Sequence, residues 1–117
     1  IDTITGGASA DTLSGGAGAD RFVYTSINDA PVAGNETITD FDATSATEDI
    51  VLNGLLSGAF SYLGAGAFSA GGNTEAIFND TSKLLSIDIN GNGAADLEIT
   101  LTGVAIADLD VTDFTVS

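Results

Sequence analysis

Short apolar runs alternate with glycine- and aspartate-rich turns along the whole chain, and no segment sustains the apolar period of a helix. Leu97, Ile99 and Leu101 alternate with polar residues, which is the period-two pattern of a half-buried strand. Residues 74–80 and 83–89 flank a polar turn at Asn79–Ser82, which predicts a hairpin. Further short strands are predicted at residues 37–41 and 49–56, and a loose strand within residues 58–73. The pattern indicates an all-β fold.

The first thirty residues contain a repeat of nine residues. The segment GGASADTLS (residues 6–14) aligns with GGAGADRFV (residues 15–23). Aspartates and apolar residues recur in phase within this segment, at Asp2, Asp11, Asp20 and Asp29 and at Ile4, Leu13 and Phe22. Glycines allow positive φ in the turns, and each apolar residue is expected to point inward from a short strand. This nonapeptide resembles the calcium-binding repeat of RTX proteins.

The nine-residue period has a direct consequence for the aspartates. If two nonapeptides complete one coil, residues two repeats apart stack at about the 4.8 Å spacing of neighbouring strands. Asp2 then lies over Asp20, and Asp11 over Asp29, so that a cation between each pair would offset their repulsion. Calcium accepts such carboxylates together with backbone carbonyls. The predicted ligands are Asp2, Gly6, Gly7, Ser9, Asp11, Gly15, Gly16, Gly18, Asp20 and Asp29; the alternative is a turn series without metal.

Composition supports a cation and limits the other partners. The formal net charge is −15, from 17 acidic residues against Arg21 and Lys83. Nucleic acid and anionic membrane surfaces are therefore not expected partners, since both need clustered basic side chains. The chain has no cysteine and no histidine, which excludes disulfides, zinc clusters and imidazole-dependent catalysis. We expect a folded monomer that does not insert into membranes, because hydrophobic residues make up 44% of the chain without forming a long apolar run.

The repeats followed by residues 21–55, residues 84–104 and a terminal DFTVS resemble the C-terminal module of serralysin-type metalloproteases and related RTX exoproteins. The resemblance implies a right-handed parallel β-roll over residues 1–30, capped by an antiparallel β-sandwich over residues 31–117. It also implies that Asp29 and Glu36 bind the last calcium of the roll. Glutamate at position 36 departs from the aspartate that is usual in the family.

Two further groups of acidic and amide residues are candidate ligands. The loop that contains Asp88, Asn90, Asn92 and Asp96 resembles half of an EF-hand, but Ile99 occupies the position of the required acid. This loop is either an Asx-rich hairpin turn or a weaker calcium site. Asp40 is interpreted as an acid at the end of a strand that helps to close the roll, with calcium binding as the alternative.

The chain ends on an acid followed by apolar residues, in the order Asp113, Phe114, Thr115, Val116 and Ser117. This tail resembles the signal by which RTX proteins engage a type I secretion transporter. We therefore expect a non-catalytic, calcium-binding module of a secreted, extracellular protein, with a passenger domain on its N-terminal side. The alternative is a structural segment of a surface-layer protein or giant adhesin, which upstream repeats would favour. Protease activity is not expected, since a zinc-protease helix needs histidine.

Overall fold

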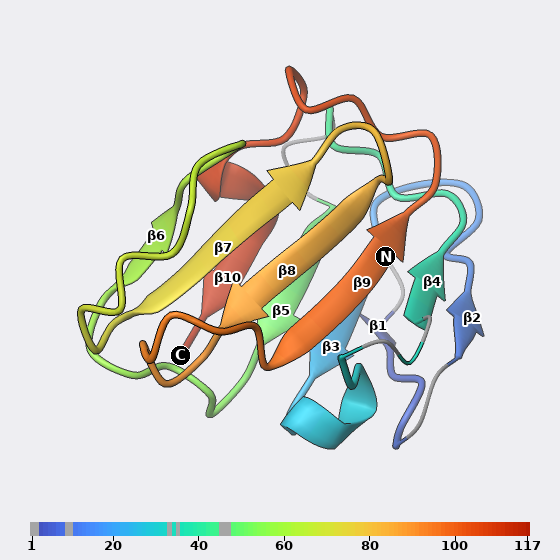
Figure 1. The fold of residues 1–117 in the computed structure, drawn as a ribbon. Coiled ribbons are helices and arrows are strands. Elements are labelled where there is room, and N and C mark those ends of the chain that lie inside the picture. The colour runs from blue at the N-terminus through green and yellow to red at the C-terminus, as the bar shows by residue number, and fades with distance from the viewer. Residues whose placement is uncertain (1–2, 9–10, 33, 35, 45–47) are drawn as a thin grey trace.

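The computed structural model describes residues 3–8, 11–32, 34, 36–44 and 48–117. These residues form ten strands and two short 3-10 helices, with no α-helix among them, which confirms the all-β expectation (Figure 1). A four-stranded sheet has the order β1 (Thr3–Ile4), β3 (Arg21–Tyr24), β5 (Asp49–Leu52), β10 (Phe114–Val116). A six-stranded sheet has the order β2 (Thr12–Leu13), β4 (Glu36–Ile38), β9 (Leu97–Leu101), β8 (Leu84–Asp88), β7 (Thr74–Asn79), β6 (Phe60–Tyr62). No helix in the described part has the length and apolar character that a membrane crossing requires.

The first five strands alternate between the two sheets, so each pair of successive strands makes one turn around the core (Figure 1). β1 pairs with β3 in parallel, and Ile4 lies opposite Phe22, as the two-repeat coil predicts. The next coils are longer. Leu13 lies opposite Ile38 because the 3-10 helix η1 (Ile27–Asp29) and the loop after it lengthen the coil. The predicted stacking of Asp11 on Asp29 is therefore wrong.

The later strands make a mixed sheet rather than an antiparallel one. Antiparallel pairing joins β7 to β8 and β8 to β9, whereas β6 pairs with β7 in parallel. β9 also pairs in parallel with β4, and β10 in parallel with β5. Each sheet thus contains strands from residues 1–30 and from residues 31–117. The antiparallel character expected for the later region is limited to the three strands β7 to β9.

Apolar side chains of the described residues form a core between the sheets. Phe22, Ile50 and Leu52 face it from the smaller sheet and are fully buried, which agrees with the inward position predicted for the apolar residue of the repeat. Ile99 and its neighbours on β9 face it from the larger sheet, with Glu98 and Thr100 half-buried between them. At one edge, Phe114 of β10 contacts the rings of two β6 residues at 5.4 Å each, and this joins the outer strands of both sheets. These two residues are Phe60 and Tyr62.

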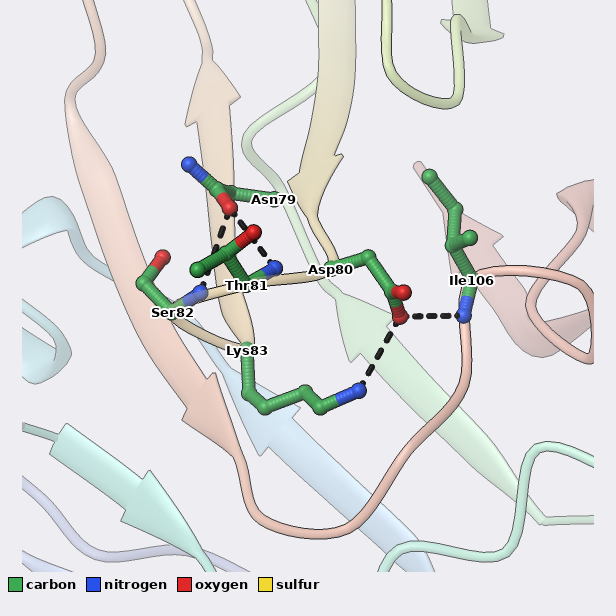
Figure 2. Close-up of polar contacts among 6 residues, drawn as sticks. All are labelled: Asn79, Asp80, Thr81, Ser82, Lys83 and Ile106. Atoms are coloured by element: carbon green, nitrogen blue, oxygen red, sulfur yellow. Dashed lines mark hydrogen bonds and ion pairs between the residues drawn. The ribbon is translucent and has the colours of Figure 1, made fainter.

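The predicted hairpin of β7 and β8 is confirmed. In its turn, the Asn79 side chain accepts the N–H groups of Thr81 at 2.9 Å and Ser82 at 3.1 Å (Figure 2). Oδ1 of Asp80 accepts both the Lys83 ammonium and the N–H of Ile106, each at 3.0 Å. The turn is therefore tied to the loop that follows β9.

Candidate metal-binding turns

The glycine-rich turns of the two repeats have the same geometry. A β-carbon on Gly6 would lie 2.6 Å from Oδ2 of Asp11, and one on Gly15 would lie 2.4 Å from Oδ2 of Asp20. The carboxylate of the aspartate in each repeat therefore occupies the space that a side chain on the first glycine would take. Only glycine at the first position of each Gly-Gly pair leaves this space open.

The second glycine of each pair has a different role. Gly7 and Gly16 have φ values of 81° and 79°, and Gly18 has a φ of 91°, all in the region that favours glycine. For Gly7, Gly16 and Gly18 this confirms the expectation that repeat glycines turn the chain through positive φ, whereas Gly6 and Gly15 do not have positive φ. Ser9 and Asp2, which were predicted as ligands, lie outside the described residues.

Asp11 lies opposite Glu36 rather than Asp29. The pairing of Thr12 with Thr37 fixes this register, and the N–H of Asp11 donates to Oε1 of Glu36 at 2.7 Å. Glu36 is fully buried, and Oδ2 of Asp11 is a buried oxygen that accepts no hydrogen bond. A buried carboxylate beside an oxygen that lacks a donor is the kind of environment that a cation stabilises. The donor set at this point fits calcium.

The electrostatic state of Glu36 supports the same conclusion. Burial raises the pKa of Glu36 above its ordinary value, hydrogen bonds from Asp11 and Tyr24 partly offset this, and the charges of Asp11 and Asp29 add to it. Tyr24 O–H donates to Oε2 of Glu36 at 3.1 Å. Burial and the Glu36 charge together raise the pKa of Tyr24, so the phenol remains the proton donor. A bound cation would favour the charged form of Glu36 at this position.

Asp29 has a local structural role. It ends η1, where its Oδ2 accepts the N–H groups of Thr25 at 3.0 Å and Ser26 at 3.2 Å. The Ser26 side chain also accepts the N–H of Asn28, and reciprocal hydrogen bonds between Ser26 and Asp29 form a capping box at the helix. Asp29 still contributes negative charge near Glu36, but the register of β2 and β4 separates it from the position opposite Asp11.

A second buried pair was missed by the sequence reasoning. The pairing of Arg21 with Asp49 places Glu48 opposite Asp20, and both acids are buried. Glu48 accepts the N–H groups of Asp42 and Asp20, and burial raises its pKa. A signal was present: Glu36 and Glu48 each stand two residues before an inward isoleucine, Glu36 as the first residue of β4 and Glu48 directly before β5. Both glutamates thus accept the N–H of a repeat aspartate.

Asp40 closes a repeat turn. Its carboxylate accepts the N–H groups of Gly15 at 2.9 Å and Gly16 at 2.7 Å, and the hydroxyl of Ser14 at 2.9 Å. Slight desolvation acts to raise the pKa of Asp40, but these hydrogen bonds outweigh it and hold the pKa below its usual value. This arrangement favours the interpretation of Asp40 as a strand-end acid that closes the coil.

The loop between β8 and β9 is a series of Asx turns. Asp88 is fully buried and accepts the N–H groups of Gly91 at 2.9 Å and Gly93 at 2.7 Å. The remaining candidate oxygens also accept backbone N–H groups within the loop, namely those of Asn90, Asn92 and Asp96. This geometry favours the hairpin-turn interpretation over a calcium site.

The tail forms part of the folded sheet. Asp113 is buried and ends the 3-10 helix η2 (Val111–Asp113), where its carboxylate accepts the N–H of Asp110 at 2.8 Å. Phe114 and Val116 then lie on β10, opposite Ile50 and Leu52. Thr115 is exposed, and the N–H of Ser117 donates to the Leu52 carbonyl. The tail residues are therefore an edge strand in the folded state.

In the described part of the chain, no three Asp or Glu side chains lie together in an arrangement that could hold a metal ion. The sites predicted from the repeats need only two carboxylates each, with carbonyl oxygens completing the shell. The structure brings together Asp11 with Glu36 and Asp20 with Glu48. It does not bring Asp88 into either group, because Asp88 accepts N–H groups within its own loop between β8 and β9.

Two β-sheets around an apolar core, with glycine turns before β2 and β3 and buried acids beside those turns, define an all-β protein whose first strands are joined by glycine-rich repeats. Residues 1–115 match the family described as Peptidase M10 serralysin C terminal, and the chain belongs to this family. The match is to the non-catalytic C-terminal region of these peptidases rather than to their catalytic domain, and such regions belong to secreted proteins. The resemblance found in the sequence is thereby confirmed. A search of curated proteins gave no match.

Proposed function

We propose that this chain is a calcium-binding module of a secreted RTX protein, which folds when it meets extracellular calcium. The observation that carries the proposal is the buried Glu36 carboxylate beside the Asp11 oxygen that accepts no hydrogen bond. In a chain with a net charge of −15, such groups oppose folding unless a cation offsets them. Residues 1–30 are proposed as the calcium-binding segment and residues 31–117 as the cap that carries the export signal.

Calcium would be held by the carboxylates and turn carbonyls of the repeats. It takes six to eight oxygen ligands at about 2.3–2.6 Å and tolerates irregular geometry, as a turn of mixed carboxylates and carbonyls requires. The proposed ligands are Asp2, Gly6, Gly7, Ser9, Asp11, Gly15, Gly16, Gly18, Asp20, Asp29 and Glu36. Because the ion binds the folded chain and not the unfolded one, its binding free energy adds to the stability of the fold.

The test is thermal unfolding of the purified chain with calcium, with excess chelator, and with magnesium in place of calcium. We expect chelator to lower the Tm by many degrees or to abolish the β-type circular dichroism. Magnesium should not restore the fold, because it demands octahedral geometry at about 2.0–2.1 Å and dehydrates reluctantly. An unchanged melt in excess chelator would show that the fold does not depend on calcium, and the proposal would fail.

The tail is proposed as an export signal that a type I transporter reads before the chain folds. In the folded chain its apolar residues pack against β5 and β6, where a transporter has little access to them. The test compares secretion of the full-length protein, with its proposed N-terminal passenger, among three forms. These are the wild type, a deletion of residues 113–117, and the double variant Phe114→Leu, Val116→Ile. Export should survive in the double variant and fail in the deletion; normal secretion of the deletion would remove the signal assignment.

A further inference from the structure

Tyr24 connects the proposed ion site to the packing of the two sheets. It lies on β3 of the four-stranded sheet and is buried, while Glu36 lies on β4 of the six-stranded sheet (Figure 1). The hydrogen bond from Tyr24 O–H to Oε2 of Glu36 therefore crosses the core between the sheets. Apolar residues such as Phe22 and Ile38 belong to the same core, and their side chains have no hydrogen-bonding group that could replace Glu36 as the partner of the Tyr24 hydroxyl.

The Glu36 carboxylate is fixed from two sides. Its Oε1 accepts the N–H of Asp11, and its Oε2 accepts the O–H of Tyr24. Each carboxylate oxygen retains a further lone pair after accepting one hydrogen bond. A carboxylate held in this way keeps its free lone pairs in one orientation and loses little further freedom when it binds an ion.

We propose that Tyr24 is a positioning residue for calcium, which orients Glu36 and links ion binding to the closing of the sheets. The inference rests on the proposed function, since it concerns the same site. It assigns a role to a side chain that does not itself touch the ion. Removal of the phenol oxygen alone should weaken calcium binding although every proposed ligand is retained.

The variant that isolates this role is Tyr24→Phe, which keeps the ring in the core and removes only the hydroxyl. Loss of a group that orients a metal ligand typically costs about 10–100-fold in affinity, so we expect the calcium Kd to rise at least about 10-fold. Tyr62→Phe is the matched control, because it removes a buried tyrosine hydroxyl that neither donates nor accepts a hydrogen bond. Ile38→Val is a second control, which loosens the core without touching Glu36.

Terbium supplies a readout of whether the ion lies close to Tyr24, because Tyr24→Phe removes the sensitising phenol itself; the calcium Kd and the double variant test the positioning role. The chain has two tyrosines and no tryptophan, so light absorbed by tyrosine can sensitise terbium bound nearby. Terbium luminescence excited through tyrosine should persist in Tyr62→Phe and be displaced by calcium. In Tyr24→Phe it should be lost even at saturating terbium. In a Glu36→Gln background, Tyr24→Phe should produce no further change in calcium affinity.

The outcomes separate this inference from the proposed function. A wild-type chain that binds calcium, with a Tyr24→Phe Kd no higher than that of Ile38→Val, would overturn the role of Tyr24 alone. Additive effects of Tyr24→Phe and Glu36→Gln would overturn it as well. A wild-type chain that binds neither calcium nor terbium would overturn both proposals.

Discussion

The carboxylate of Asp20 occupies the place where a side chain on Gly15 would begin, since a β-carbon there would fall 2.4 Å from Oδ2. Gly15 does not have the positive φ of Gly16, so its need for glycine is steric rather than conformational. We expect Gly15→Ala to lower the free energy of unfolding by about 1–3 kcal/mol, the usual cost of overpacking. Denaturant unfolding at fixed calcium concentration measures this loss.

Two further variants control the interpretation of Gly15→Ala. The Asp20→Ala background removes the crowded carboxylate, so Gly15→Ala should cost clearly less there than in the wild type. Gly16→Ala should lose about 1–2 kcal/mol in either background, because a β-carbon at Gly16 meets no atom within 4 Å and its cost comes from φ alone. Equal losses for Gly15→Ala in both backgrounds would contradict the steric explanation.

The raised pKa of the buried Asp113 side chain should make the stability of the fold depend on pH. Burial raises its pKa from 3.8 to about 6, and the nearby charges of Asp110, Asp49 and Asp42 add to this. The stabilisation that follows from this raised pKa is fully present below pH 3.8 and is lost as the pH rises through about 6, where the folded-state carboxyl ionises. Asp113→Asn should therefore be more stable than the wild type at neutral pH, by up to about 2–3 kcal/mol.

The measurement is the difference in unfolding free energy between the wild type and Asp113→Asn across this pH range. The difference should shrink on acidification, since the wild-type side chain then also becomes neutral. Comparing the two proteins removes the contributions of other buried acids such as Glu36 and Glu48, which both share. A constant difference from neutral to acid pH would mean that Asp113 does not titrate in this range.

The loss of unfolding free energy should depend on calcium concentration for Asp20→Ala but not for Asp88→Ala. Asp88→Ala leaves the N–H groups of Gly91 and Gly93 without their acceptor, and should cost about 1–3 kcal/mol at any calcium concentration. Asp20→Ala should cost more as calcium rises, because the wild type gains ion-binding free energy that the variant loses. Unfolding at two calcium concentrations distinguishes them; a calcium-dependent loss at Asp88 would place an ion in that loop.

Removal of the tail should destabilise the purified chain. Phe114 is buried against Phe60 and Tyr62, and β10 forms a parallel pair with β5. Phe114→Ala should lower the unfolding free energy by about 3–5 kcal/mol, and deletion of residues 113–117 should lower it further. Thr115→Ala is the control on the exposed face of the same strand; it removes one exposed hydrogen bond to Asp49 and should cost no more than about 0.5–1.5 kcal/mol. A deletion as stable as the wild type would contradict the placement of β10 in the sheet.

The sequence by itself determined the features that depend on local chemistry. The phase of the repeats predicted the register of Ile4 with Phe22, because glycine turns of fixed length leave only one coil size. The polar turn after Asn79 predicted the hairpin, and alternation predicted the buried face of β9. In each case a fixed spacing within a short segment of the chain sets the outcome, through turn chemistry or side-chain period.

The tertiary structure alone decided which acids meet. Asp11 lies opposite Glu36 and Asp20 opposite Glu48, because the loops between the strands lengthen the later coils after the repeat phase has ended. The pairing of β10 with β5 at the edge of the smaller sheet likewise joins residues from distant parts of the chain. Parallel pairing requires a long connection whose length the strand sequences do not encode. The packing of the two sheets around the core therefore determines which strands pair, and these strand pairs set the positions of the buried carboxylates.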